Sequence, residues 1–104
     1  MKQPHHKEIR ELYQAILSLE TEAEARAFFR DLLTESEIAE FAERWKAARM
    51  LAQGKPYLAI SAETGLSSTT VARVARWVKE GTGGYRLALK RLGIQTKGRR
   101  TIDD

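Results

Sequence analysis

Hydroxyl and cationic side chains gather between residues 67 and 79, in an order that suits contact with a polyanion. Short hydroxyls come first, arginines follow at helical spacing, and a lysine precedes the segment. Hydroxyls can bond to bases or phosphates, and arginine can bind guanine or phosphate through two hydrogen bonds. The pattern therefore predicts a DNA-binding face. Its members are Lys55, Ser67, Ser68, Thr69, Thr70, Arg73, Arg76 and Lys79.

The side-chain types also predict a division of roles within this face. Lys55, Arg76 and Lys79 are expected to contact phosphates, which fix the register of a protein on the duplex without reading its sequence. The hydroxyls at 68–70 and the guanidinium of Arg73 are expected to reach base edges in the major groove.

Residues 55–79 predict two short helices joined by a tight turn. Pro56 can open the first helix, because its missing N–H is harmless in a first helical turn. Gly65 supplies the left-handed conformation that a sharp turn needs and that other residues adopt at a cost. Ser67 is a suitable N-cap for the second helix, with Ser68 as an alternative. The pattern predicts a helix-turn-helix, and a helical hairpin with a solvated polar face is the alternative interpretation.

An apolar stripe at helical spacing runs along the second helix of this pair. It consists of Val71, Val74, Ala75 and Val78. We expect the stripe to pack inward against Leu58 and Ile60 of the first helix, which leaves the hydroxyls and arginines on the opposite face.

Charge is unevenly distributed along the 104 residues. Residues 1–53 carry eight basic and ten acidic side chains, whereas residues 54–104 carry ten basic and four acidic ones, so the predicted DNA-binding half has a balance of +6. Such asymmetry indicates a polyanionic partner.

The composition argues against other classes of protein. The chain has no cysteine, and so no disulfide, thiolate nucleophile or thiolate metal site. His5 and His6 are expected to be solvated rather than to bind metal. Phosphate-binding glycine loops and clustered histidines with carboxylates are lacking, so neither an enzyme nor a cofactor is expected. No apolar run approaches the ~18 residues of a membrane span, and we expect a cytoplasmic protein.

The remaining sequence predicts four more helices and no strand, so the expected fold is all-α with six helices. Apolar residues recur at helical spacing in 7–19, which predicts the first helix. Capping-box sequences at Thr21 and Thr34 predict the starts of two further helices, and the helix that begins after Thr34 is expected to run to Gln53. A glycine-rich break precedes a short helix at 85–92. In the third helix, the expected apolar stripe is Ile38, Phe41, Ala42, Trp45, Ala48 and Leu51.

The predicted organisation is one helical domain over 7–93, between a flexible stretch at 1–6 and a flexible basic tail at 94–104. The helices of 7–53 carry more aromatic surface than a monomer of this length easily covers. A two-fold dimer would cover that surface and double the contacts of one recognition helix. We therefore expect a homodimer on double-stranded DNA.

Several motifs together resemble the Trp repressor superfamily, and within it the TrpR-like YerC/YecD family. They include Leu32-Leu33-Thr34, Leu51-Ala52-Gln53-Gly54 and the segment from Thr64 to Arg73, and the likeness covers about residues 7 to 93. The resemblance implies an intertwined all-α homodimer with dimerisation helices in 7–53, two helix-turn-helix heads formed by 55–79, and a pseudo-palindromic operator.

The resemblance also places a possible ligand pocket. The two arginines that hold tryptophan in the Trp repressor match Arg44 and Arg73, and its ligand-binding threonine matches Thr34. Val74 and Trp77 stand where the repressor has a small glycine and serine, so the slot is expected to reject free tryptophan. Alternatively, Arg44 pairs with Glu40 or Glu37 along its helix, and Arg73 binds DNA rather than a small molecule.

The expected function is that of a sequence-specific DNA-binding transcriptional regulator, a repressor by resemblance, with no small-molecule effector identified. The alternative is an adaptor of the transcription machinery that uses a relic helix-turn-helix to bind another polypeptide.

Overall fold

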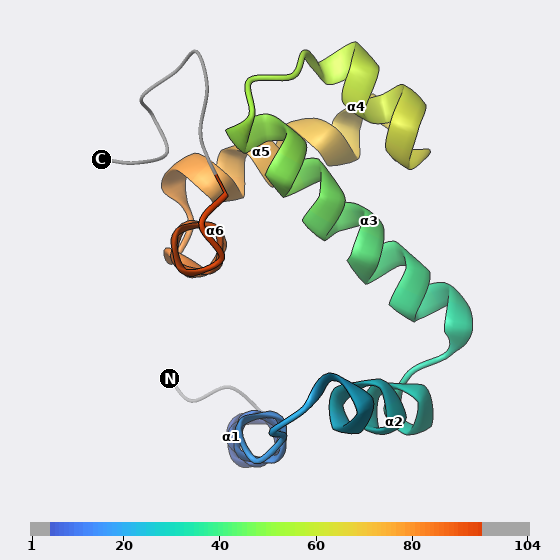
Figure 1. Ribbon diagram of the computed structural model, residues 1–104, viewed down its shortest axis with the longest axis vertical. Helices are drawn as coiled ribbons and strands as arrows, with labels where there is room; N and C mark the ends of the chain where they lie inside the picture. Colours follow the sequence, from blue (N-terminus) through green and yellow to red (C-terminus); the bar gives the residue numbers. More distant parts are fainter. Residues whose placement is uncertain (1–4, 95–104) are drawn as a thin grey trace. The chain divides into compact units, whose positions relative to one another are not determined.

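The structure, a computed structural model, describes residues 5–94, and six α-helices account for most of this range, which contains no strand (Figure 1). The all-α prediction with six helices is thus confirmed. The expectations for residues 1–4 and for the basic tail beyond Ile94 lie outside the described residues. The helices are α1 (His6–Leu17), α2 (Glu22–Leu32), α3 (Glu35–Ala52), α4 (Tyr57–Thr64), α5 (Ser68–Glu80) and α6 (Gly84–Arg91).

The chain divides into two compact units, with the boundary between Ile38 and Ala39 inside α3. The first unit holds α1, α2 and the start of α3. The second holds the rest of α3 together with α4, α5 and α6. It therefore contains the whole predicted DNA-binding segment.

The capping box predicted at Thr34 is confirmed, and the one at Thr21 forms in part, because its carboxylate accepts from the N–H of the residue before the N-cap. The Thr21 hydroxyl accepts from the Glu24 N–H at 3.1 Å, while the Glu24 carboxylate accepts from the Glu20 N–H. Thr34 and Glu37 pair reciprocally, each backbone N–H donating to the other's side chain at 2.9 and 3.1 Å. These bonds satisfy N–H groups that a helix start leaves without partners.

Helices α1 and α2 are amphipathic but bury none of their residues. Leu17 is 83% exposed, and Tyr13 and Leu32 are also exposed. Phe28 and Phe29 contact each other edge to face, with ring centroids 5.4 Å apart. The apolar side chains of this unit are thus only partly covered within one chain.

The core of the chain lies in the second unit. It is formed by small and branched side chains from four helices, and Trp45, Leu51, Leu66 and Tyr85 are among the half-buried residues packed against it. The buried apolar residues are Ala47, Ala48, Met50, Ala52, Ile60, Val71, Val74, Ala75, Val78 and Leu89.

The predicted stripe of α3 is only partly right. Ala48 is buried and Trp45 and Leu51 are half-buried, but Phe41 is 50% exposed and Ala42 is exposed. Helical spacing marks residues that share a face, yet it does not say how far along the helix a neighbour covers that face. The buried residues of α3 are confined to its last six positions, 47–52.

The turn between α4 and α5 forms as predicted. Gly65 adopts a left-handed conformation, with φ of 78°, and its N–H donates to the Ser61 carbonyl. The buried Thr64 hydroxyl donates to the Ile60 carbonyl at 2.7 Å and accepts from the Leu66 N–H at 3.2 Å. The Ser61 hydroxyl donates to the Leu66 carbonyl at 2.8 Å. Side chains of α4 thus hold the turn that leads into α5.

The predicted packing of α4 is right for Ile60 and wrong for Leu58. Ile60 is fully buried, whereas Leu58 is 83% exposed. Positions two apart on a helix lie about 200° apart around its axis, so one neighbouring helix cannot cover both.

Candidate nucleic-acid interface

The two faces of α5 separate as the sequence indicates. Its apolar stripe is buried against the core, and the predicted contact residues Thr69, Arg73, Arg76 and Lys79 are exposed. Lys55, which precedes α4, is exposed as well. Helix α5 packs against α4 and contributes its apolar stripe to the core of the second unit. The position of its exposed face on that unit is therefore fixed.

Two hydroxyls at the start of α5 serve the helix itself. The Ser67 hydroxyl accepts from the Thr70 N–H at 3.1 Å, which confirms Ser67 as the N-cap. It lies 3.1 Å from the Thr70 hydroxyl, to which it donates. Ser68 and Thr69 are exposed and make no side-chain hydrogen bond within residues 5–94. They are therefore the hydroxyls of this turn most open to an outside partner.

The cations of α5 are engaged to different degrees. Arg76 pairs with Glu80 one turn later at 3.7 Å, with both side chains more than two-thirds exposed. An ion pair this exposed contributes little to the stability of the fold, so a phosphate can readily replace the Glu80 carboxylate as the partner of Arg76. Within residues 5–94, Arg73 has no carboxylate at ion-pair distance. Its exposed guanidinium has no ion pair to break among these residues before it makes a bidentate contact.

The residues that match a ligand pocket are held in different ways. Arg44 bonds to the Glu40 carboxylate at 2.8 Å, so the alternative of pairing along its own helix is what the structure shows. Thr34 belongs to the capping box of α3. Val74 is buried in the core at 3% exposure, and the Trp77 indole is 52% exposed. A ligand role for this set stays a prediction.

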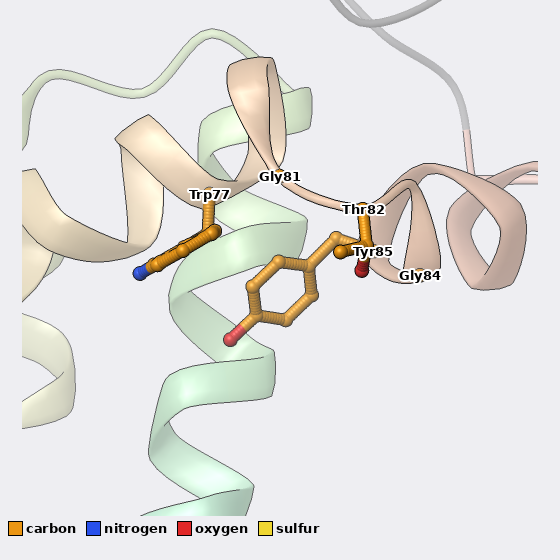
Figure 2. A pocket seen from close by; sticks show the side chains of 5 residues that line it. All are labelled: Trp77, Gly81, Thr82, Gly84 and Tyr85. Carbon is orange, nitrogen blue, oxygen red and sulfur yellow. The ribbon is translucent and has the colours of Figure 1, made fainter. Parts of the chain in front are cut away.

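Sequence reasoning missed a shallow pocket of about 390 Å³ at the end of α5. It is lined by Trp77, Gly81, Thr82, Gly84 and Tyr85, and Figure 2 shows the Trp77 ring projecting from α5 and the Tyr85 ring projecting from the helix on the other side of the linker. Two aromatic residues that bracket a run of glycines were the signal in the sequence.

Tyr85, which lines the pocket, also belongs to an aromatic pair. The Tyr85 ring stacks on Trp45 of α3, with centroids 6.3 Å apart and planes 17° apart. Burial raises the pKa of the Tyr85 phenol above its usual value, and the positive charge of Arg44 partly opposes this rise. The phenol therefore stays neutral at physiological pH.

Other chemistry finds no support in the part of the chain that the structure describes. Over residues 5–94, no group of three or more histidine, cysteine or acidic side chains is placed to hold a metal ion. None of the described helices has the length and apolar character needed to cross a membrane.

The described residues form a small all-α fold in which α5 exposes a face of hydroxyl and cationic side chains. Comparison with known proteins agrees: the family model of the Trp repressor protein matches residues 7–93, and the chain belongs to the Trp repressor family. This is a family of regulators that are not enzymes.

Individual relatives are similar over most of their length. The uncharacterized protein YerC of Bacillus subtilis (strain 168) is 43% identical over 86 residues, which are 83% of each chain. A TrpR-like protein from Eubacterium eligens has a solved structure with a TM-score of 0.82 and 40% identity, over 88% of this chain and 94% of that one. A candidate Trp repressor from Staphylococcus aureus gives a TM-score of 0.82 and 36% identity, over 92% and 100%.

Proposed function

We propose that this protein is a sequence-specific DNA-binding transcriptional regulator, in which α4 and α5 form a helix-turn-helix and α5 is the recognition helix. The observation that carries the proposal is the division of α5 into a buried apolar stripe and an exposed face of hydroxyls and cations. Membership of the Trp repressor family supports the same function.

The surroundings of each side chain refine its proposed role. Ser68, Thr69 and Arg73 are open to solvent and reach base edges in the major groove. Ser67 and Thr70 set the start of the recognition helix through their mutual hydrogen bonds, with their remaining acceptor capacity turned to the duplex. The phosphate contacts are made by Lys55, Arg76 and Lys79, and the pair of Arg76 with Glu80 opens as the phosphate is bound.

A homodimer is the second part of the proposal. Helices α1 and α2 have apolar faces but bury no residue, and Phe41 near the start of α3 is half exposed. Large apolar faces left uncovered in a chain of 104 residues favour burial against a second copy. The dimerisation role falls to residues 7–53, and the two recognition helices then read two half-sites.

Free L-tryptophan does not control this regulator. Val74 fills its position with a buried side chain, and the Arg44 guanidinium is already bonded to Glu40. Isothermal titration with L-tryptophan is expected to show no heat of binding up to millimolar ligand. Micromolar binding would show that the slot is open.

An adaptor that binds another polypeptide is the second candidate. Tyr57 and Leu58 present exposed apolar surface at the start of α4. Adjacent exposed apolar side chains are a common feature of protein-binding surfaces.

Selection from a pool of random-sequence duplexes separates the two functions. The regulator is expected to enrich one sequence, with a pseudo-palindromic arrangement of half-sites about one helical turn apart. An adaptor would enrich none, and the recovered pool would match the input.

A further inference from the structure

The last turn of α5 is held by a side chain from α6. Arg86 donates from Nε to the Val78 carbonyl at 3.0 Å, and its Nη2 group donates to the Lys79 carbonyl. The last four carbonyls of a helix have no partner within the helix, and a cation at this end also meets the negative end of the helix dipole. One planar guanidinium satisfies two of these carbonyls at once.

Helix α6 is itself fixed to the core. Leu89 is 2% exposed within the hydrophobic cluster, and Tyr85 stacks on Trp45 of α3. Leu89 lies one turn after both Tyr85 and Arg86, at i+4 and i+3, so it is a neighbour of each on the surface of α6. Helix α6 therefore joins the core, through Tyr85 and Leu89, to the end of α5, through Arg86.

The connection between the two helices does not set their geometry by itself. Only residues 81–83 separate α5 from α6, and two of these three are glycines. The first of them lies tightly against α5, because a Cβ on Gly81 would come within 2.4 Å of the Trp77 carbonyl oxygen. A glycine linker is permissive in its backbone angles, so a fixed angle needs a side-chain restraint. Arg86 provides one.

We propose that Arg86 is a positioning residue for DNA recognition, which clasps the end of the recognition helix and sets its direction relative to the core. The inference rests on the proposed function of α5. We call the two hydrogen bonds from Arg86 to the Val78 and Lys79 carbonyls the clasp. Lys79 is also a proposed phosphate contact, so the clasp fixes both the axis of α5 and the place of its last cation.

The test compares three variants of the full chain. Arg86→Ala removes the clasp, and Arg86→Lys keeps the charge but not the planar fork that reaches two carbonyls. Arg91→Ala is the matched control, because it removes one exposed cation from the same helix without touching α5. Affinity is measured for the selected duplex and for a random-sequence duplex over a range of salt concentrations.

A positioning role affects specific binding alone. Arg86→Ala is expected to weaken binding to the selected duplex about tenfold, with binding to random sequence changed less than twofold and the salt slope unaltered. Arg86→Lys should lose about threefold, and Arg91→Ala should keep the specificity ratio of the parent chain. If instead Arg86→Ala weakens both duplexes equally and lowers the salt slope by about 0.9, Arg86 is a phosphate contact and the proposal is wrong.

Amide hydrogen exchange in the protein without DNA tests the clasp separately. Amides at residues 79–81 are expected to exchange about tenfold faster in Arg86→Ala and at the parent rate in Arg91→Ala. Unchanged exchange in Arg86→Ala would overturn the clasp even if DNA binding falls. If the parent chain binds no duplex, the proposed function fails, while exchange still decides whether Arg86 holds α5.

Discussion

Arg73 is the residue on which direct reading of DNA depends most in this account. Its guanidinium is exposed on α5 and has no ion-pair partner within residues 5–94, so two donors are free for a guanine edge. Arg76, one turn further along, is already paired with Glu80 and is better suited to a phosphate.

Replacing Arg73 by alanine is expected to cost roughly 1–3 kcal/mol of binding free energy for the selected duplex and to relax the base preference at one position. Arg91→Ala is the control, because Arg91 is an exposed arginine of α6 and lies outside both the proposed DNA-binding face and the proposed dimerisation helices. A gel-shift titration with single-base variants of the duplex measures both effects. An Arg73→Ala protein that binds with parental affinity would contradict the assignment of the reading face.

Tyr85 gives stability a dependence on alkaline pH. Its folded-state pKa is raised, mainly by burial and despite the charge of Arg44. The unfolded chain therefore loses this proton first, and the contribution of the neutral phenol is present below about pH 10 and is lost as pH rises through the folded-state pKa.

The variant Tyr85→Phe is expected to remove this contribution. Urea unfolding at pH 8 and at pH values above 10 should show a smaller alkaline loss of unfolding free energy for the variant than for the parent chain. Equal losses would indicate that the phenol ionises as freely in the folded protein as in the unfolded one.

Among the helices and turns, the turn between α4 and α5 sets the proposed recognition helix in place. Gly65 has a φ of 78°, and a Cβ added there would meet no atom within 4 Å. The cost of Gly65→Ala is therefore one of backbone conformation alone, roughly 1–2 kcal/mol of unfolding free energy. Gly84→Ala is the matched control, since it lies at the start of α6 with the same open space and no positive φ. In urea unfolding it should be neutral or slightly stabilising, and equal effects at both positions would contradict the role of the turn.

The opposite burial of two apolar residues in α4 is also testable. Ile60→Ala should lower the unfolding free energy by about 2–5 kcal/mol, because Ile60 is fully buried in the core. Leu58→Ala should change it by no more than ~0.5 kcal/mol, since Leu58 is exposed. A large effect of Leu58→Ala in the isolated protein would indicate that a second copy covers this residue.

Local signals in the sequence predicted most of the elements. The Thr21 cap, the capping box at Thr34, the N-cap at Ser67 and the left-handed Gly65 depend on neighbouring residues only, and each one forms as expected. Properties that depend on a distant partner were predicted less well. Leu58 and Phe41 were expected in apolar stripes, yet residues 5–94 leave Leu58 83% and Phe41 50% exposed.

In the candidate site, too, the sequence predicted local features better than contacts between distant residues. The exposed face of α5 follows from its own helical spacing, but the clasp of Arg86 joins residues eight apart across a glycine linker. No periodic pattern marks such a contact, because it depends on the angle between two helices. The pocket between Trp77 and Tyr85 was missed for the same reason.

For the whole molecule, the proposed regulator combines two features of one chain. One is the set of apolar faces on α1 and α2, which have no fully buried residue in the part of the chain that the structure describes. The other is the cationic surface of the second unit, within the half of the sequence that carries a balance of +6. In a dimer that pairs through the apolar faces of α1 and α2, each copy presents its cationic surface to the same duplex.

Light scattering of the purified chain, alone and with the selected duplex, tests this account most directly. The proposed homodimer should give a particle of twice the 11.8 kDa chain mass in the absence of DNA, and two chains on each duplex in the complex. A particle of 11.8 kDa whose mass does not change on addition of any duplex at low salt would contradict it.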